Sequence, residues 1–195
     1  MEGVNGLDVS HRLFETLRNE HAQIRNALTR FSSADVSRED VMAAWKIAEL
    51  IHHPKEEKIL FSSLLPNQMV DGGGPLCMIY LDQYIMNSPL DRAKRITGEL
   101  PAAEEHTRAF FDAGSAMRIP INEHRAGKAI LQFLIEHWDE LDSAKKQTAL
   151  REYVDLENYH MEKEENCFFY HCATLLTPEQ ADALLAAWQR APAAD

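Results

Sequence analysis

Apolar residues recur at steps of three and four along four long stretches of the chain, and this spacing predicts amphipathic α-helices. The stretches cover about residues 8–32, 37–65, 120–142 and 143–175. No stretch alternates with a period of two for long enough to indicate a β-sheet. We therefore expect an all-α protein in which the four long helices pack around a shared core.

Turn-forming residues separate the second long helix from the third. The segment Asp71 to Pro75 (DGGGP) is a loop, and the region 71–119 that it opens contains further proline and glycine residues. We expect this region to be an insertion of short helices. Near the end of the chain, Thr177, Pro178 and Gln180 have the spacing of a capping box with proline at the first helical position, which predicts a short C-terminal helix. Residues 1–195 are expected to form a single domain.

Polar residues occupy positions on the apolar face of each long helix. The first and third helices each place one histidine there, and the second and fourth each place a His-x-x-x-Glu pair. The i, i+4 spacing puts an imidazole and a carboxylate on the same side of a helix. The six residues are His21, His52, Glu56, His124, His160 and Glu164.

These six residues favour a metal site when they are considered together. A single histidine on an apolar face is most often a core residue with one hydrogen-bond partner, and an isolated His-x-x-x-Glu pair is often a surface pair. Two buried carboxylates, however, are costly unless positive charge compensates them. Four imidazoles and two carboxylates suit iron, and less specifically manganese or zinc. The alternative is a metal-free network of protonated histidines and glutamates.

The two His-x-x-x-Glu pairs lie in similar segments, HHPKEEKILF and HMEKEENCFF. Together with the single histidines, they make residues 8–65 and 120–175 resemble the hemerythrin-like family of HHE cation-binding domains. The resemblance implies a four-helix up-down bundle with two non-haem iron ions, joined by an oxo or hydroxo bridge, in its core; zinc and manganese are the alternative metals. It implies that the six residues ligate these ions and that Glu56 and Glu164 bridge them.

The ligand set has alternatives. Hemerythrins that carry oxygen use a further histidine, often on the third helix, but here Lys128 stands one turn after His124. The candidates for a seventh ligand are His53, Glu20, Glu57, Glu123 and His171.

A ferritin-like carboxylate site is a second interpretation of the same region. Glu49 and Glu157 each stand three residues before a histidine, which is the Glu-x-x-His spacing of such sites, and Glu20 and Glu123 could complete the set. We prefer the hemerythrin-like interpretation because the histidines that follow Glu20 and Glu123, rather than these glutamates, lie on the apolar faces.

The expected function is binding or sensing of O2, NO or iron, and the expected small ligand is a diatomic molecule or peroxide. Two alternatives stay open. The same site could serve a di-iron enzyme with ferroxidase, peroxide-consuming or nitric-oxide stress repair activity. The metal could also only stabilise an interaction module whose insertion, residues 71–119, contacts a protein partner. The sequence therefore leaves open whether the protein is an enzyme.

Charge and hydropathy exclude other classes of partner. The formal net charge is −11, with 31 acidic and 20 basic residues, whereas nucleic-acid binding needs clustered lysine and arginine. No run of about 18 apolar residues indicates a membrane span. The N-terminus lacks the basic start and apolar segment of a signal peptide. We expect no nucleic-acid or membrane partner and a cytoplasmic location.

Overall fold

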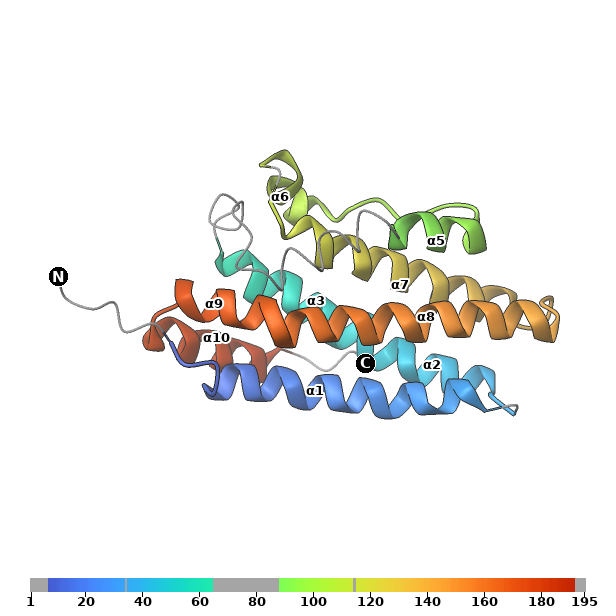
Figure 1. Ribbon diagram of the computed structural model, residues 1–195, viewed down its shortest axis with the longest axis horizontal. Coiled ribbons are helices and arrows are strands. Elements are labelled where there is room, and N and C mark those ends of the chain that lie inside the picture. Colours follow the sequence, from blue (N-terminus) through green and yellow to red (C-terminus); the bar gives the residue numbers. More distant parts are fainter. Residues whose placement is uncertain (1–6, 34, 65–87, 114, 192–195) are drawn as a thin grey trace.

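The computed structural model describes residues 7–33, 35–64, 88–113 and 115–191. These residues form helices and contain no β-strand, which confirms the prediction of an all-α protein. Four long helical segments lie alongside one another, and successive segments run in opposite directions (Figure 1). The arrangement brings together helical faces that are far apart in the sequence.

The first segment consists of α1 (Arg12–Leu28) and a 3-10 turn, Thr29–Ser32. His11 caps α1, because its side chain accepts a hydrogen bond from the backbone N–H of Leu13 at 3.2 Å. The buried residues of α1 recur at steps of one, three and four, and they are Leu13, Phe14, Leu17, His21, Ile24 and Leu28. His21 is therefore buried among apolar side chains, as its position on the predicted helix indicates.

The second segment begins with α2 (Arg38–Ile47), which Ser37 and Asp40 cap reciprocally. It continues through a π-helical turn (Ala48–His52), α3 (His53–Lys55), a second π-helical turn (Glu56–Leu60) and a 3-10 turn (Phe61–Ser63). Pro54, which cannot donate a backbone hydrogen bond, stands between the two π-helical turns. The wider turns accommodate the proline without ending the segment.

The fourth segment repeats one of these features. It consists of α8 (Ser143–Lys163), a π-helical turn (Glu164–Phe168) and α9 (Phe169–Leu175). In an α-helix, residues five apart point in directions that differ by about 140°. The π-helical turns that start at Glu56 and Glu164 reduce this difference, so that each glutamate and the phenylalanine five residues later, Phe61 or Phe169, are buried together.

The third segment is α7 (Arg118–His137), which ends before the predicted boundary at 142 because the chain turns there and the side chain of Asp142 caps α8. The described part of the predicted insertion contains α5 (Pro89–Thr97), a 3-10 turn (Glu105–Thr107) and α6 (Arg108–Asp112). Its first part, 71–87, lies outside the described residues. α5 packs against α7.

The chain closes with α10 (Pro178–Arg190), which has the predicted capping box and packs against α1.

The interior is divided into two apolar clusters. One contains Leu17, Phe61, Ile121 and Phe169, and the other contains Ile24, Ala48, Leu131 and Leu156. On every long segment the predicted polar site residues lie between a member of one cluster and a member of the other. The core is thus two apolar regions separated by a buried polar layer.

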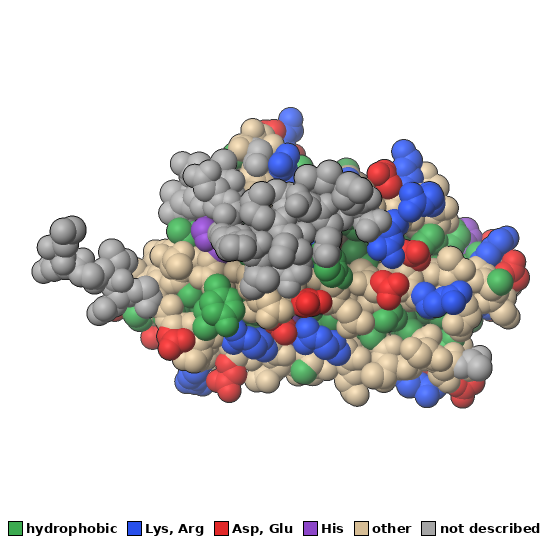
Figure 2. Space-filling model, viewed as in Figure 1, with side chains coloured by type: hydrophobic (Ala, Val, Ile, Leu, Met, Phe, Trp, Pro, Cys, Tyr) green, Lys and Arg blue, Asp and Glu red, His purple; other side chains and the backbone are tan. Residues whose placement is uncertain are grey.

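The surface is mixed in character. On the face drawn in Figure 2, acidic and basic side chains of the described residues are interspersed. None of the described helices has the length and apolar composition needed to cross a membrane.

Candidate metal centre

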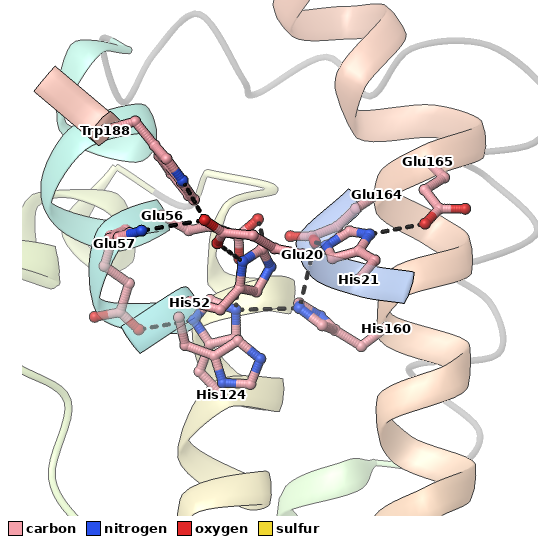
Figure 3. A network of polar contacts seen from close by, with 12 residues as sticks. Glu20, His21, His52, Glu56, Glu57, His124, His160, Glu164, Glu165 and Trp188 are labelled. Carbon is pink, nitrogen blue, oxygen red and sulfur yellow. Dashed lines mark hydrogen bonds and ion pairs between the residues drawn. The ribbon is translucent and has the colours of Figure 1, made fainter. Parts of the chain in front are cut away.

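The structure brings all six predicted site residues together (Figure 3). They form two groups in which the possible ligand atoms lie within 4.8 Å of one another. Each of the six side chains is buried. The groups are His21, His52, Glu56 and Glu164, and Glu56, His124, His160 and Glu164. The two glutamates belong to both groups, so the donors describe two adjacent positions that share their carboxylates.

The inward contacts have the pattern expected of bridging carboxylates. One oxygen of Glu164, Oε2, lies 3.2 Å from Nε2 of His21 and 3.4 Å from Nε2 of His160. The two oxygens of Glu56 face different histidines: Oε1 lies 3.5 Å from Nε2 of His52, and Oε2 lies 3.4 Å from Nε2 of His124. Each carboxylate therefore faces one histidine from each group.

Many of these inward atoms have no hydrogen-bond partner. This holds for Nε2 of His21 and His52 and for all four carboxylate oxygens of Glu56 and Glu164. Buried polar atoms without partners are rare in folded proteins, and each such group calls for an explanation. A cation among these atoms would satisfy them. These buried donors could therefore hold a metal ion.

The opposite edge of each imidazole is held by a second carboxylate. Nδ1 of each histidine lies within hydrogen-bond distance of a glutamate, and Nε2 faces inward, where the Nε2 atoms of His124 and His160 lie 3.1 Å apart. A proton on Nδ1 would leave the lone pair of Nε2 free to bind a cation. The pairs are His21 with Glu165 at 2.8 Å, His52 with Glu20 at 2.8 Å, His124 with Glu57 at 2.9 Å and His160 with Glu123 at 3.1 Å. In each pair the glutamate and the histidine come from neighbouring segments, and the four pairs close a ring around the layer. We call these glutamates the outer carboxylates.

The outer carboxylates are sequence neighbours of the inward-facing residues. Glu20, Glu57 and Glu123 are candidates for a seventh ligand from the sequence, but the structure places them on the Nδ1 side of the histidines. Glu165 was not singled out from the sequence. The signal that could have identified it is the repeated Glu-Glu doublet, since Glu57 follows Glu56 as Glu165 follows Glu164.

Each outer carboxylate also faces a basic side chain. Trp188 adds a hydrogen bond from Nε1 to Glu20 at 2.8 Å. The basic partners are Lys55 for Glu20, His106 for Glu57, Lys163 for Glu123 and Arg25 for Glu165. The layer is therefore organised from inside to outside as two carboxylates, four imidazoles, four carboxylates and four basic groups.

Burial favours the neutral form of two of the four imidazoles, those of His52 and His124. Burial lowers the pKa of His52 to about 4. Burial and the nearby His53 and His160 lower the pKa of His124 well below its usual value. Unprotonated histidines have the lone pair that metal binding requires.

The two inward carboxylates differ in their pKa. Burial, followed by the charge of Glu164, raises the pKa of Glu56 well above its usual value. Burial would also raise the pKa of Glu164, but His160 and His21 outweigh it and lower this pKa to about 2. A proton on Glu56 thus relieves the repulsion between the two carboxylates when no cation is bound, and a bound metal would displace it.

His53 is the remaining candidate that lies beside the centre. Its ring stacks on that of His124, with 4.1 Å between the ring centroids, and its nitrogen atoms approach those of His124 and His160. A cavity of about 320 Å³ adjoins this side, and His53, Glu57 and His124 are among its lining residues. His171 is only half-buried and belongs to none of the close donor groups among the described residues.

The ferritin-like interpretation shares His52 and His160 with the core pocket, but its four glutamates lie outside the two core groups. Glu49 and Glu157 form a different group, with His53, and Glu20 and Glu123 are outer carboxylates.

Comparison with known proteins gives no significant match, either to a family model, to a curated protein or to a solved structure. The chemical interpretation therefore depends on the geometry of these side chains.

Proposed function

We propose that the chain is a hemerythrin-like protein whose four long segments form an up-down bundle and whose core binds two iron ions. Its function on this proposal is to bind or sense O2, NO or iron. The observation that supports it best is the pair of overlapping donor groups that share Glu56 and Glu164. When bound, two such ions supply redox chemistry and coordination positions for a small ligand.

The ligand count leaves room for such a ligand. His21 and His52 would hold one ion, His124 and His160 would hold the other, and both carboxylates would be shared. Each ion then has two nitrogen and two oxygen donors from the protein, which is fewer than a six-coordinate ion requires. A diatomic molecule or peroxide is small enough to use the remaining positions.

The residues around the donors orient them and keep the site dry. The outer carboxylates fix the tautomer and direction of each imidazole and increase its basicity. Aromatic rings stack on two of the histidines: Phe169 on His21 and Phe61 on His124, each with 5.7 Å between centroids. The apolar clusters on both sides of the layer exclude water, which strengthens the interaction of the donors with a cation.

Catalysis at the same centre is the second candidate function. It is favoured by the cavity of about 320 Å³ beside His53 and His124, because reversible binding of a diatomic ligand does not require a space of this size. Such an enzyme would oxidise ferrous iron, consume peroxide or repair nitric-oxide damage.

Elemental analysis and absorption spectra of protein from iron-supplemented cultures test the proposal. We expect at least two irons per chain and a visible absorption band that changes with O2 or NO. Turnover of peroxide or ferrous iron would favour the enzyme. His124→Ala should lose bound iron, whereas His137→Ala, at a more exposed histidine on the same helix, should keep it. Equal iron content in both variants would contradict the proposal.

A further inference from the structure

A second group of buried donors lies next to the four-histidine layer. It consists of Glu49, His53 and Glu157, whose possible ligand atoms lie within 4.8 Å of one another. These residues are 4%, 2% and 1% exposed, respectively. None of the three is among the six residues assigned to the two core positions, and both segments that supply His-x-x-x-Glu pairs contribute to the group.

The contacts within this group leave buried atoms without partners. Nδ1 of His53 lies 3.1 Å from Oε2 of Glu49, within hydrogen-bond distance, and the hydroxyl of Tyr153 donates to Oε1 of Glu49 at 3.1 Å. Nε2 of His53 lies 3.4 Å from Oε2 of Glu157, and neither of these two atoms has a hydrogen-bond partner. One imidazole therefore serves two carboxylates and satisfies only one of them.

Compensating charge is also missing from this group. In the part of the chain that the structure describes, neither Glu49 nor Glu157 forms an ion pair with lysine or arginine; His53 is the basic partner of both. Even a protonated His53 would supply one positive charge for two carboxylates. A buried pair of carboxylates with a single imidazole suits a divalent cation better than a proton network.

A glycine on α7 provides the space for these carboxylates. A Cβ atom at Gly127 would lie 2.8 Å from Oε1 of Glu157 and 2.9 Å from Oε1 of Glu49. Any other residue at this position would push into the two side chains. The two carboxylates thus occupy the space that a side chain at position 127 would fill.

The group breaks the similarity between the two His-x-x-x-Glu segments. Glu49 and Glu157 occupy equivalent positions, three residues before His52 and His160. The residue after His52 is His53, but the residue after His160 is Met161, which is buried in an apolar cluster. His53 is therefore not needed to complete the repeated core pocket, and its buried nitrogen atoms belong to an additional arrangement.

We propose that Glu49, His53 and Glu157 bind a third cation, a divalent transition-metal ion such as Zn²⁺, Mn²⁺ or Fe²⁺. The two carboxylates neutralise its charge, and one nitrogen of His53 completes the set of three protein donors. The site goes beyond the proposed function, because its donors are separate from the six residues of the core positions. The cavity lined by Glu49 and His53 provides access to it.

Metal titration of the full chain tests this site. Metal-free protein is dialysed against excess Zn²⁺, and bound zinc per chain is measured by elemental analysis. The variants are Glu49→Gln/Glu157→Gln and His53→Met, which places at 53 the residue found at the equivalent position 161. Glu162→Gln, at an exposed position of α8, is the control. We expect both variants to bind one ion per chain fewer than the wild type, and the control to bind the same number.

The outcomes separate this site from the core positions. Unchanged zinc in Glu49→Gln/Glu157→Gln overturns the third site, and so does a loss confined to His53→Met, which would assign His53 to the core. If the wild type and all variants bind two ions, only the core positions stand; if the wild type binds none, both proposals fail. Should a variant lose its helical circular dichroism, anomalous diffraction from zinc-soaked wild-type crystals decides. A peak in contact with Glu49, His53 and Glu157 is expected, and its absence there contradicts the site.

Discussion

The two halves of the chain contribute equivalent histidines and glutamates to the buried layer, but the groups next to these residues differ between the halves. Each half contributes a Glu-His doublet on one segment, Glu20-His21 or Glu123-His124, and a His-x-x-x-Glu-Glu motif on the next segment. Equivalent residues have equivalent roles: the histidine and the first glutamate face inward, and the other glutamates hold a neighbouring histidine by Nδ1. The repetition indicates that both halves build one pocket from the same types of donor. The differences between the halves lie in the groups around these donors.

The outer carboxylates show where the halves differ. Glu57 of the first half faces His106 from the insertion, whereas its equivalent in the second half, Glu165, faces Arg25. Burial opposes ionisation of Glu20, but His52 and Trp188 outweigh it and lower its pKa to about 2. Burial raises the pKa of Glu57 to about 7. The carboxylate that holds His124 is therefore less committed to a negative charge than the one that holds His52, and it lies beside the cavity.

The largest effect is expected when both shared carboxylates are neutralised. Glu56→Gln/Glu164→Gln should lose both core ions, because each glutamate serves both halves and the remaining imidazoles carry no charge to offset two cations. Elemental analysis of iron-loaded protein measures this, with Glu162→Gln as the control. Retention of both ions would show that the halves bind metal independently of these residues.

Metal removal should weaken the attachment of the halves to each other. A metal ion whose free concentration is 100 times its dissociation constant adds about 2.7 kcal/mol to the free energy of unfolding. For a chain of this size, that free energy corresponds to a Tm difference of roughly 5–10 °C. Calorimetry of iron-loaded protein with and without a chelator measures the difference. A chelated protein with an unchanged Tm would speak against ligands drawn from both halves.

The outer carboxylates should have smaller and unequal effects. Loss of a group that orients a metal-bound histidine costs about 10–100-fold in metal affinity. We expect Glu20→Gln to reach this range, and Glu57→Gln to have a smaller effect because Glu57 is already partly protonated near neutral pH. Competition against a chelator of known affinity measures both. An equal loss of metal affinity in the two variants would contradict the difference between Glu20 and Glu57.

The smallest effect concerns pH and the metal-free protein. The pKa of Glu57 is raised from 4.5 to about 7, so the folded state binds this proton more tightly than the unfolded state. The stability from this group is fully present below pH 4.5 and is lost as the pH rises to about 7. Glu57→Gln should flatten that part of the Tm profile in the presence of chelator. A profile identical to that of the wild type would contradict the raised pKa.

The sequence predicts the inward residues because their spacing follows the helical period. His21 and His124 interrupt apolar faces, and the paired spacing of His52 with Glu56 needs no knowledge of neighbouring helices. The roles of Glu20, Glu57, Glu123 and Glu165 depend on which imidazole the adjacent segment presents, and a single helix does not contain that information.

Two further features depend on packing. The π-helical turns at the inward glutamates share a Glu-Glu doublet followed by phenylalanine, but this pattern does not predict a π-helical turn from the sequence, and the burial of Phe61 and Phe169 follows from the turns. The absence of a side chain at Gly127 makes room for Glu49 and Glu157, which lie on other segments. In both cases the decisive contacts join residues that are distant in the sequence.

The most direct test of the account is a crystal structure of the iron-loaded protein with anomalous data collected at the iron edge. We predict two peaks about 3.5–4 Å apart, one contacted by His21 and His52 and the other by His124 and His160, with Glu56 and Glu164 in contact with both. A pocket without iron, in which these six side chains bond only to one another, would contradict it.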